Sequence, residues 1–432
     1  MTNVDRFDPF ERRISEALDG VAPLRRPDYL DDILQLTARA SQRPRWTFAE
    51  RWFPIDTTMS RSSRFGRLPL RQLLILAVLL ALAAGTIAIY VGSQKKLPPP
   101  LGLAANGQIT FGLDGDIYVR KTATGETRLL LGGPSDQGGV DSSPDGQLIA
   151  YDNAVDGIDH AWVANIDGSN PRPLLDPAFT GVDFAWAYDS RSAAAITDSA
   201  GFNQLWVAPV DGSGAHERTF NHKLPYQAIW DPARPGVLLV RMADLDRNDQ
   251  MDLYYVDAAN GSILSKIALP GTNLYGPGFE FAGMAFSPDG STIAYNSVES
   301  ESTGTHFWVR LVDRDGANDR SVALPAGVPN LYSQAWPDFS PDGKWIALES
   351  WVGQPGTGLR QLALVAVDGI GPTRRVGPAL GQSMDKSWAP DGTKVLIHFE
   401  TIDDSYLIDV LSGAVTPLDW KSDSPDWQRI AQ

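Results

Sequence analysis

A ten-residue pattern recurs along the C-terminal two-thirds of the chain and constrains its fold more than any other feature. The pattern reads Phe-Ser-Pro-Asp-Gly-x-x-Ile-Ala-Tyr at 286–295, and close copies begin at Ser142, Phe339 and Trp388. In each copy an extended run ends at Pro-Asp-Gly, which is typical of a type I turn, and the chain continues as an alternating strand. One such hairpin cannot bury its apolar face alone, so we expect the copies to pack against one another.

A second marker sets the length of the repeat. An aromatic-rich or apolar strand ends in a Gly turn seven times, and the closing glycines are Gly125, Gly168, Gly212, Gly261, Gly316, Gly369 and Gly413. They lie 43 to 55 residues apart, which is enough chain for four short strands and their turns. This is the length of one β-propeller blade, so seven markers predict seven blades.

The repeats resemble the WD40-like (PD40) repeats of bacterial TolB-type β-propellers, from about residue 106 to the end of the chain. The pattern at 286–295 carries the resemblance. It implies an all-β fold, a seven-bladed β-propeller over residues 108–432. Because one fold hosts many unrelated functions, the resemblance carries no reaction with it.

The end of the chain is expected to close the ring. The first blade begins near Gln108 without an innermost strand, and residues 424–429 (Ser-Pro-Asp-Trp-Gln-Arg) read as that missing strand. Pairing this strand into the first blade would remove two open sheet edges. Matched strand positions carry aromatic residues that we expect to pack between blades: Trp162, Trp206, Tyr254 and Trp308.

A segment ahead of the repeats has the length and composition of a membrane span. No charged residue occurs from Gln72 to Gln94, and about 20 apolar residues cross the hydrocarbon core of a bilayer as a helix. We therefore predict one transmembrane helix over residues 70–92. Arginines precede this segment more densely than lysines follow it. By the positive-inside rule, the N-terminus stays in the cytoplasm and the propeller lies outside it, at the cell membrane.

The segment before the span, residues 1–69, is predicted to be a small helical, arginine-rich cytoplasmic region. A capping box at 47–50 indicates the start of one helix, and aromatic residues lie among arginines around it. Such a mixture fits a small helical core, docking at the membrane interface, or a cytoplasmic protein partner for residues 1–68. Residues 93–107 are predicted to form a Pro-rich linker.

One hairpin tip has the spacing of a calcium loop. Residues 244–252 match D-x-[DN]-x-[DN]-x-x-x-D, which resembles the calcium loops of EF-hands, dockerins and integrin-type propellers. The ligands of a structural Ca²⁺ would be the side-chain oxygens of Asp244, Asp246, Asn248 and Asp252 with the backbone carbonyl of Gln250. Asp249 replaces the usual turn Gly, and no Glu stands at position 12. The alternative is an acidic, solvated hairpin tip.

Familiar catalytic motifs do not occur in the sequence. It contains no Cys, its five His residues have no metal-binding spacing, and it has neither a G-x-S-x-G elbow nor a GxxxxGK[ST] loop. No catalytic residue is therefore predicted. The net charge of −15 opposes nucleic-acid binding, because a phosphate backbone would be repelled.

Together these features predict a non-enzymatic, single-pass membrane protein whose propeller is a binding scaffold or sensor. Its ligand outside the membrane would be a protein, a peptide or a glycan. One alternative is a transmembrane regulator that resembles anti-sigma factors, with the propeller as its sensor. The other is a propeller-type hydrolase or lyase that uses the central funnel of the ring.

Overall fold

The computed structural model describes residues 78–80 and most of the chain from Leu101 to Ala431. Between those two residues the described part excludes 156–157, 176–179, 200–201, 271–282, 302–303, 323–335, 353–357, 370–372, 382–383, 401 and 403. The chain divides into two units, residues 1–93 and 94–432. Nearly everything described belongs to the second unit.

The predicted helical region 1–69 lies outside the described residues. Of the predicted span 70–92, only Val78, Leu79 and Leu80 are described, and these three are helical and exposed. In the described part of the chain, no helix is both long enough and apolar enough to cross a membrane.

The described strands form seven four-stranded antiparallel sheets, which we number as blades in chain order. Blade 1 holds β28 (Asp423–Ile430), β1 (Ala105–Leu113), β2 (Asp116–Arg120) and β3 (Thr127–Leu131). Blade 2 holds β4 (Asp136–Ser142), β5 (Leu148–Val155), β6 (Ile158–Asn165) and β7 (Arg172–Pro173). Blade 3 holds β8 (Thr180–Trp186), β9 (Ser192–Ser199), β10 (Phe202–Pro209) and β11 (His216–Arg218).

The remaining four blades repeat this order. Blade 4 holds β12 (Lys223–Trp230), β13 (Val237–Asp244), β14 (Gln250–Asp257) and β15 (Ile263–Ile267), with the 3₁₀ turn η3 (Leu245–Arg247) in its middle hairpin. Blade 5 holds β16 (Met284–Phe286), β17 (Thr292–Glu301), β18 (Gly304–Asp313) and β19 (Arg320–Ser321). Blade 6 holds β20 (Asp338–Phe339), β21 (Trp345–Val352), β22 (Leu359–Ala366) and β23 (Arg374–Leu380). Blade 7 holds β24 (Asp385–Trp388), β25 (Lys394–Phe399), β26 (Asp404–Asp409) and β27 (Val415–Pro417).

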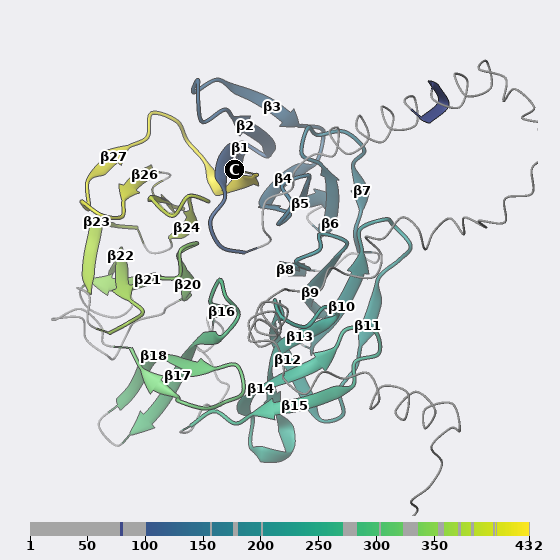
Figure 1. Cartoon of the computed structure of the whole chain (residues 1–432), viewed down its shortest axis with the longest axis vertical. Coiled ribbons are helices and arrows are strands. Elements are labelled where there is room, and N and C mark those ends of the chain that lie inside the picture. Colours follow the sequence, from purple (N-terminus) through teal and green to yellow (C-terminus); the bar gives the residue numbers. More distant parts are fainter. Residues whose placement is uncertain are drawn as a thin grey trace, which may run out of the picture. The chain divides into compact units, whose positions relative to one another are not determined.

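The sheets stand around a common centre, with the first strand of each blade innermost (Figure 1). The predicted all-β, seven-bladed propeller is therefore confirmed. The predicted closure is confirmed as well, because β28 pairs with β1 through Ala105 and Ile430 at one end and Thr110 and Asp426 further along. The last strand of the chain thus completes the first blade.

The Ser-Pro-Asp-Gly turns hold their shape through one repeated set of hydrogen bonds. In blade 5 the Ser287 hydroxyl donates to Asp289 Oδ1 at 2.6 Å, and the same carboxylate oxygen accepts from Ser291 N at 3.0 Å. Gly290 N donates to Ser287 O at 2.8 Å, with Gly290 at φ +68°. A left-handed φ of this kind favours Gly, and the Asp of the motif is structural.

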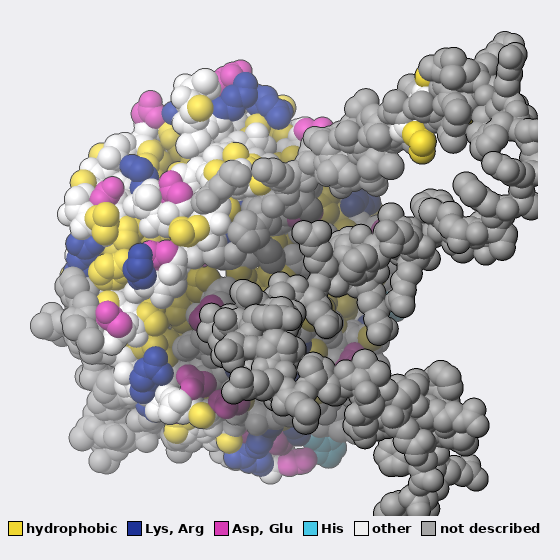
Figure 2. Space-filling model, in the orientation of Figure 1, with side chains coloured by type: hydrophobic (Ala, Val, Ile, Leu, Met, Phe, Trp, Pro, Cys, Tyr) yellow, Lys and Arg dark blue, Asp and Glu magenta, His cyan; other side chains and the backbone are white. Residues whose placement is uncertain are grey.

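Apolar side chains fill the space between neighbouring blades rather than one central core. Each of seven buried clusters joins two adjacent sheets; for example, Leu205 and Val207 of blade 3 pack with Leu238 and Val240 of blade 4. Burial of these apolar faces is the main stabilising contribution to the ring. On the outer side, hydrophobic, basic and acidic side chains are interspersed over blades 6 and 7, at the left of Figure 2.

The matched aromatic residues behave as predicted where they are described. Tyr254 is buried in the cluster between blades 3 and 4, while Trp162 and Trp206 pack at the edges of two other clusters. Trp206 Nε1 also donates to the Thr197 hydroxyl at 3.1 Å. The side chain of Trp308 lies outside the described residues.

Candidate functional site

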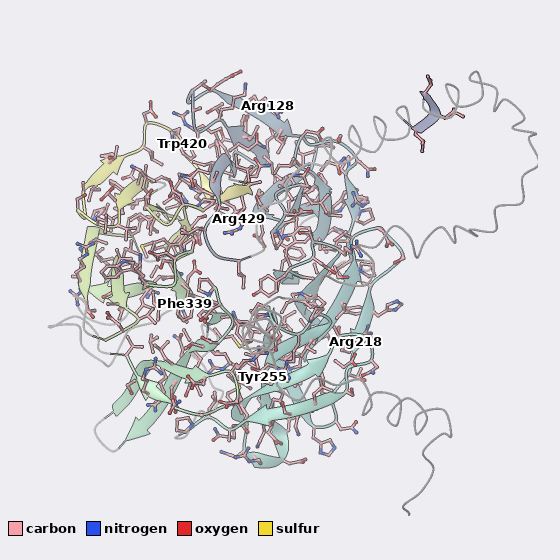
Figure 3. All side chains as sticks on the ribbon, in the orientation of Figure 1. Arg128, Arg218, Tyr255, Phe339, Trp420 and Arg429 are labelled. Atoms are coloured by element: carbon pink, nitrogen blue, oxygen red, sulfur yellow. The ribbon has the colours of Figure 1, made fainter. Side chains whose placement is uncertain are left out.

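A cavity of about 860 Å³ occupies the centre of the ring. Its wall comes from the innermost strands, chiefly β4, β20, β24 and β28, and the prolines of the repeated turns surround one end. Phe339 and Arg429 lie at the inner edge of the ring in Figure 3. The volume is within the range of ligand-binding pockets, roughly 300–1,000 Å³.

Among the described residues that line this wall, the acidic side chains lie on one part of it. The position two residues ahead of each repeated turn is Asp141 in blade 2, Asp338 in blade 6 and, by the same strand register, Asp426 in blade 1. Blade 7 has Ser387 there, and Asp385 lies two residues earlier on the same strand. We call Asp141, Asp338, Asp385 and Asp426 the acidic arc.

The opposite side of the ring is apolar at the same register. Blades 3, 4 and 5 carry Ala185, Ile229 and Ala285 at the position that holds Asp in blades 1, 2 and 6. Ring closure alone does not require this difference, because all seven blades have the same architecture. The asymmetry therefore marks the arc formed by blades 6, 7, 1 and 2 as the candidate site.

The environment of the arc favours the protonated form of its carboxyls. Burial, and then the charges of Glu400, Asp423 and Glu349, raise the pKa of Asp385 to about 7, although Lys386 acts in the opposite direction. Burial raises the pKa of Asp338 to about 6; Lys386 opposes this shift and Asp426 adds to it. A carboxyl with such a pKa exchanges a proton readily near neutral pH.

Asp141 and Asp426 form a close pair within the arc. Burial, and then the charge of Asp426, raise the pKa of Asp141 well above its usual range. Burial also raises the pKa of Asp426, although Asp426 Oδ2 accepts a hydrogen bond from Ser142 N at 2.8 Å. Two neighbouring carboxyls of this kind titrate as a pair and favour the state that shares one proton.

Three basic side chains share the cavity with the carboxyls. Arg360 Nε lies 3.8 Å from Glu349 Oε2, and burial raises the pKa of Glu349. Arg429 Nη2 donates to Gly102 O at 2.6 Å, where the chain enters the propeller. With Lys386, these are three cations among six acidic residues, since Glu349 and Glu400 add to the arc. The cavity therefore favours cationic over anionic ligands.

This arrangement can provide both a proton donor and a proton acceptor. Near neutral pH the carboxyl of Asp385 is partly protonated and can donate a proton, while a neighbouring ionised carboxylate can accept one. The sequence analysis did not single out these groups. Aligning the strands that precede each turn would have shown Asp in some repeats and Ala or Ile in others.

The predicted calcium loop lies far from the arc, at the β13–β14 hairpin of blade 4. Asp244 ends β13 and caps η3, accepting from Asp246 N at 3.2 Å. Asn248 and Asp249 both have positive φ, +54° and +56°, so Asp249 adopts the left-handed conformation usually supplied by Gly. Gln250 begins β14 opposite Asp244.

The carboxylates of this loop contact basic side chains. Asp252, fully buried, lies 2.5 Å from Arg247 Nη1 and 3.1 Å from Lys266 Nζ. Lys223 contacts Asp244, and His222 contacts Asp246. Among the described residues, no group of three or more acidic or His side chains has the geometry of a metal site. In this geometry the loop does not form an ion cage, and Ca²⁺ binding stays a prediction for measurement.

Comparison with known proteins finds a partial sequence match to an enzyme. No known family profile matches the sequence. The chain is 30% identical over 138 residues to dipeptidyl aminopeptidase BIII of Pseudoxanthomonas mexicana. The match covers 31% of this chain and 20% of that relative, so it spans about a fifth of the relative's length.

Solved structures share the fold at low identity. One structure from a study of two prolyl endopeptidases matches with a TM-score of 0.50 at 15% identity, over 83% of this chain and 56% of that chain. TolB from Acinetobacter baumannii matches with a TM-score of 0.47 at 14% identity, over 76% and 81% of the two chains. An oligogalacturonate lyase in complex with manganese matches with a TM-score of 0.49 at 15% identity, over 73% and 85%. At these identities the likeness concerns the propeller fold alone.

The prediction of a non-enzymatic scaffold or sensor is contradicted by these findings. The curated relative is a peptidase, and the propeller fold recurs in a prolyl endopeptidase structure. The sequence prediction rested on the absence of linear catalytic motifs. The carboxyls of the acidic arc come from four different strands and form no such motif.

Proposed function

We propose that this protein is a hydrolase that acts on peptide-like amides at the acidic arc of its central cavity. The observation that carries the proposal is the acidic arc itself, in which Asp385 has a pKa of about 7 and Asp338 of about 6 on the wall of one cavity. The identity to a dipeptidyl aminopeptidase supports an amide substrate.

The proposed reaction assigns one role to each form of the carboxyl. An ionised carboxylate, Asp338, accepts a proton from water while the water oxygen bonds to the amide carbon. The protonated Asp385 donates its proton to the leaving nitrogen as the C–N bond breaks. The excess of acidic groups in the cavity favours substrates with a free amino group or a basic side chain.

The test is an amide hydrolysis assay with the full-length chain. Dipeptidyl 4-nitroanilides with free and with acetylated N-termini would be compared, and we expect faster cleavage of the free form. Asp385→Asn is expected to lower kcat/KM by about 10²–10⁴-fold, the usual contribution of a general acid. Glu126→Gln, an exposed change on blade 1, serves as the control and is expected to keep full activity.

Two results would overturn the proposal. One is the absence of cleavage across the amide panel by the wild-type protein. The other is an unsaturated elimination product from an oligogalacturonide, with no amide cleavage, which would indicate a lyase instead.

We also propose that residues 70–92 anchor the chain in the cell membrane, with the propeller outside the cytoplasm. The uncharged run and the flanking basic residues support this arrangement. Within the second unit, the chain enters the propeller on the side of the repeated turns, where Ala104 N donates to Pro390 O at 2.9 Å. Protease added to intact cells is expected to degrade the propeller; full protection would contradict this orientation.

A further inference from the structure

The repeated turns normally leave no space between blades. A Cβ added at Gly290 in blade 5 would lie 2.6 Å from Pro232 Cγ of blade 4. A Cβ at Gly343 in blade 6 would lie 3.5 Å from Pro288 Cδ of blade 5. The Gly of one turn thus packs directly on the Pro of the preceding turn.

The contact between blades 3 and 4 departs from this pattern. Tyr188 replaces the Pro of the blade 3 turn, and the blade 4 turn from Asp231 to Gly236 is one residue longer than the repeat. A Cβ added at Gly236 would meet no atom within 4 Å. A groove of about 630 Å³ remains, which we call the blade 3–4 groove. Its apolar wall includes Tyr188, Val207, Pro209, Trp230, Pro232 and Pro235.

One cation in the groove has an unused donor. In blade 2, Arg172 donates both Nε and Nη2 to Val210 O of blade 3, at 2.8 and 2.6 Å. Arg218 of blade 3 donates Nε to Ala258 O of blade 4 at 2.7 Å and Nη1 to Glu217 O at 3.1 Å. Within the described residues, Nη2 of Arg218 makes no hydrogen bond. Figure 3 shows Arg218 well away from the centre of the ring.

The charge around the groove favours an anion at Arg218. Burial lowers the pKa of Arg218, and the charge of Asp257 acts in the opposite direction; the guanidinium stays charged at neutral pH. Asp231 lies in the groove wall, but Arg234 and Arg314 contact its carboxylate at 2.6 and 2.7 Å and balance its charge. Apart from Tyr188, two titratable groups remain in the lining. These are Asp189 and His216, and both are exposed.

We propose that the blade 3–4 groove binds a small apolar carboxylate. The apolar body would lie against Trp230, Tyr188 and the prolines, and the carboxylate would accept hydrogen bonds from Arg218 Nη2. The site is distinct from the acidic arc and does not depend on the proposed hydrolase activity. Tyr188 lines both cavities, so a ligand in the groove would contact a side chain of the central wall.

The experiment compares a charged and a neutral probe of one shape on the full-length chain. Calorimetric titration is expected to give saturable, one-to-one binding of 2-naphthoate and at least tenfold weaker binding of 2-naphthamide. Arg218→Gln is expected to weaken the binding of 2-naphthoate by about tenfold to a hundredfold, since a hydrogen bond to a charged group contributes about 1.5–3 kcal/mol. The same variant should bind 2-naphthamide as the wild type does.

Arg172→Gln is the matched control, because it removes an arginine with the same inter-blade contact but outside the groove. It is expected to bind 2-naphthoate like the wild type. Ala259→Trp, at the exposed edge of the groove, is expected to block both probes without unfolding the protein. Equal binding of the two probes, no saturable binding, or equal losses in the Arg218 and Arg172 variants would overturn the proposal. So would concentration-dependent dimerisation that Ala259→Trp abolishes, which would assign the groove to a second copy of the chain.

Discussion

At the scale of single residues, Asp has two opposite roles in one repeat. In the turn of blade 5, hydrogen bonds from the Ser287 hydroxyl and Ser291 N lower the pKa of Asp289. On the wall of the central cavity, burial raises the pKa of Asp338 and Asp385. The difference follows from the surroundings: the Asp289 carboxylate is exposed and accepts hydrogen bonds, whereas Asp338 and Asp385 are half-buried near other acidic groups.

The raised pKa of Asp385 predicts a pH-dependent stability. An unfolded Asp titrates near 3.9, so between about pH 4 and 7 the folded state binds more protons than the unfolded state. Stability from this group is therefore full below pH 4 and is lost as the pH rises to about 7. Asp385→Asn should be stabilising at pH 8, by on the order of a few kcal/mol, and nearly neutral at pH 4.

Urea unfolding at several pH values measures this effect. Asp211→Asn serves as the control, because hydrogen bonds from Ser213 lower the pKa of Asp211 and it is ionised in both states above pH 5. The free energy of unfolding of Asp211→Asn should change with pH as that of the wild type does between pH 5 and 8. An unchanged slope in Asp385→Asn would contradict a raised pKa in the folded protein.

The turn carboxylates predict a stability change of a different kind. Asp289→Ala removes the acceptor for Ser287 Oγ, Ser291 N and Ser291 Oγ. The free energy of unfolding is expected to fall by about 1–2 kcal/mol, measured by urea denaturation. Asp289→Asn keeps one acceptor oxygen and should recover part of the loss. A neutral Asp289→Ala would show that Pro288 and Gly290 define the turn without it.

At the scale of elements, the middle hairpin of blade 4 is the test of the calcium prediction. Calcium is expected to raise the melting temperature of the wild-type protein but not that of Asp246→Ala. The reason is that a ligand that binds only the folded state stabilises that state. Binding would have to displace Lys223 and Lys266 from Asp244 and Asp252. Identical melting curves with and without calcium would instead favour the acidic hairpin tip.

The same scale shows what the sequence could predict. The turn at 287–290 and the strand after it follow from local chemistry, so the blades and their order were predictable. The acidic arc depends on which residues face the centre, and this is fixed by the register of β20, β24, β28 and β4 across blades. Asp141 and Asp426 are separated by nearly the whole propeller sequence, so only ring closure brings them together.

At the scale of the whole molecule, the ring is closed by β28 without a covalent bond. This strand contributes three features at once: the pairing with β1, the buried Trp427 between blades 7 and 1, and Asp426 of the acidic arc. Each blade packs on two neighbours, so loss of one contact exposes apolar faces on both sides. The closure therefore couples the stability of the propeller to the integrity of its candidate site.

Truncation tests this coupling directly. A chain that ends at Ser422 loses β28, and we expect a lower melting temperature and no amide hydrolysis, because β1 becomes an open edge and the arc loses Asp426. Trp427→Ala keeps the strand and is expected to lower the free energy of unfolding by about 3–5 kcal/mol, since it removes a buried indole. Removal of residues 431–432 alone leaves β28 complete and is the matched control. If the chain ending at Ser422 melts like this control, β28 does not hold the ring closed, and each blade depends on its sequence neighbours alone.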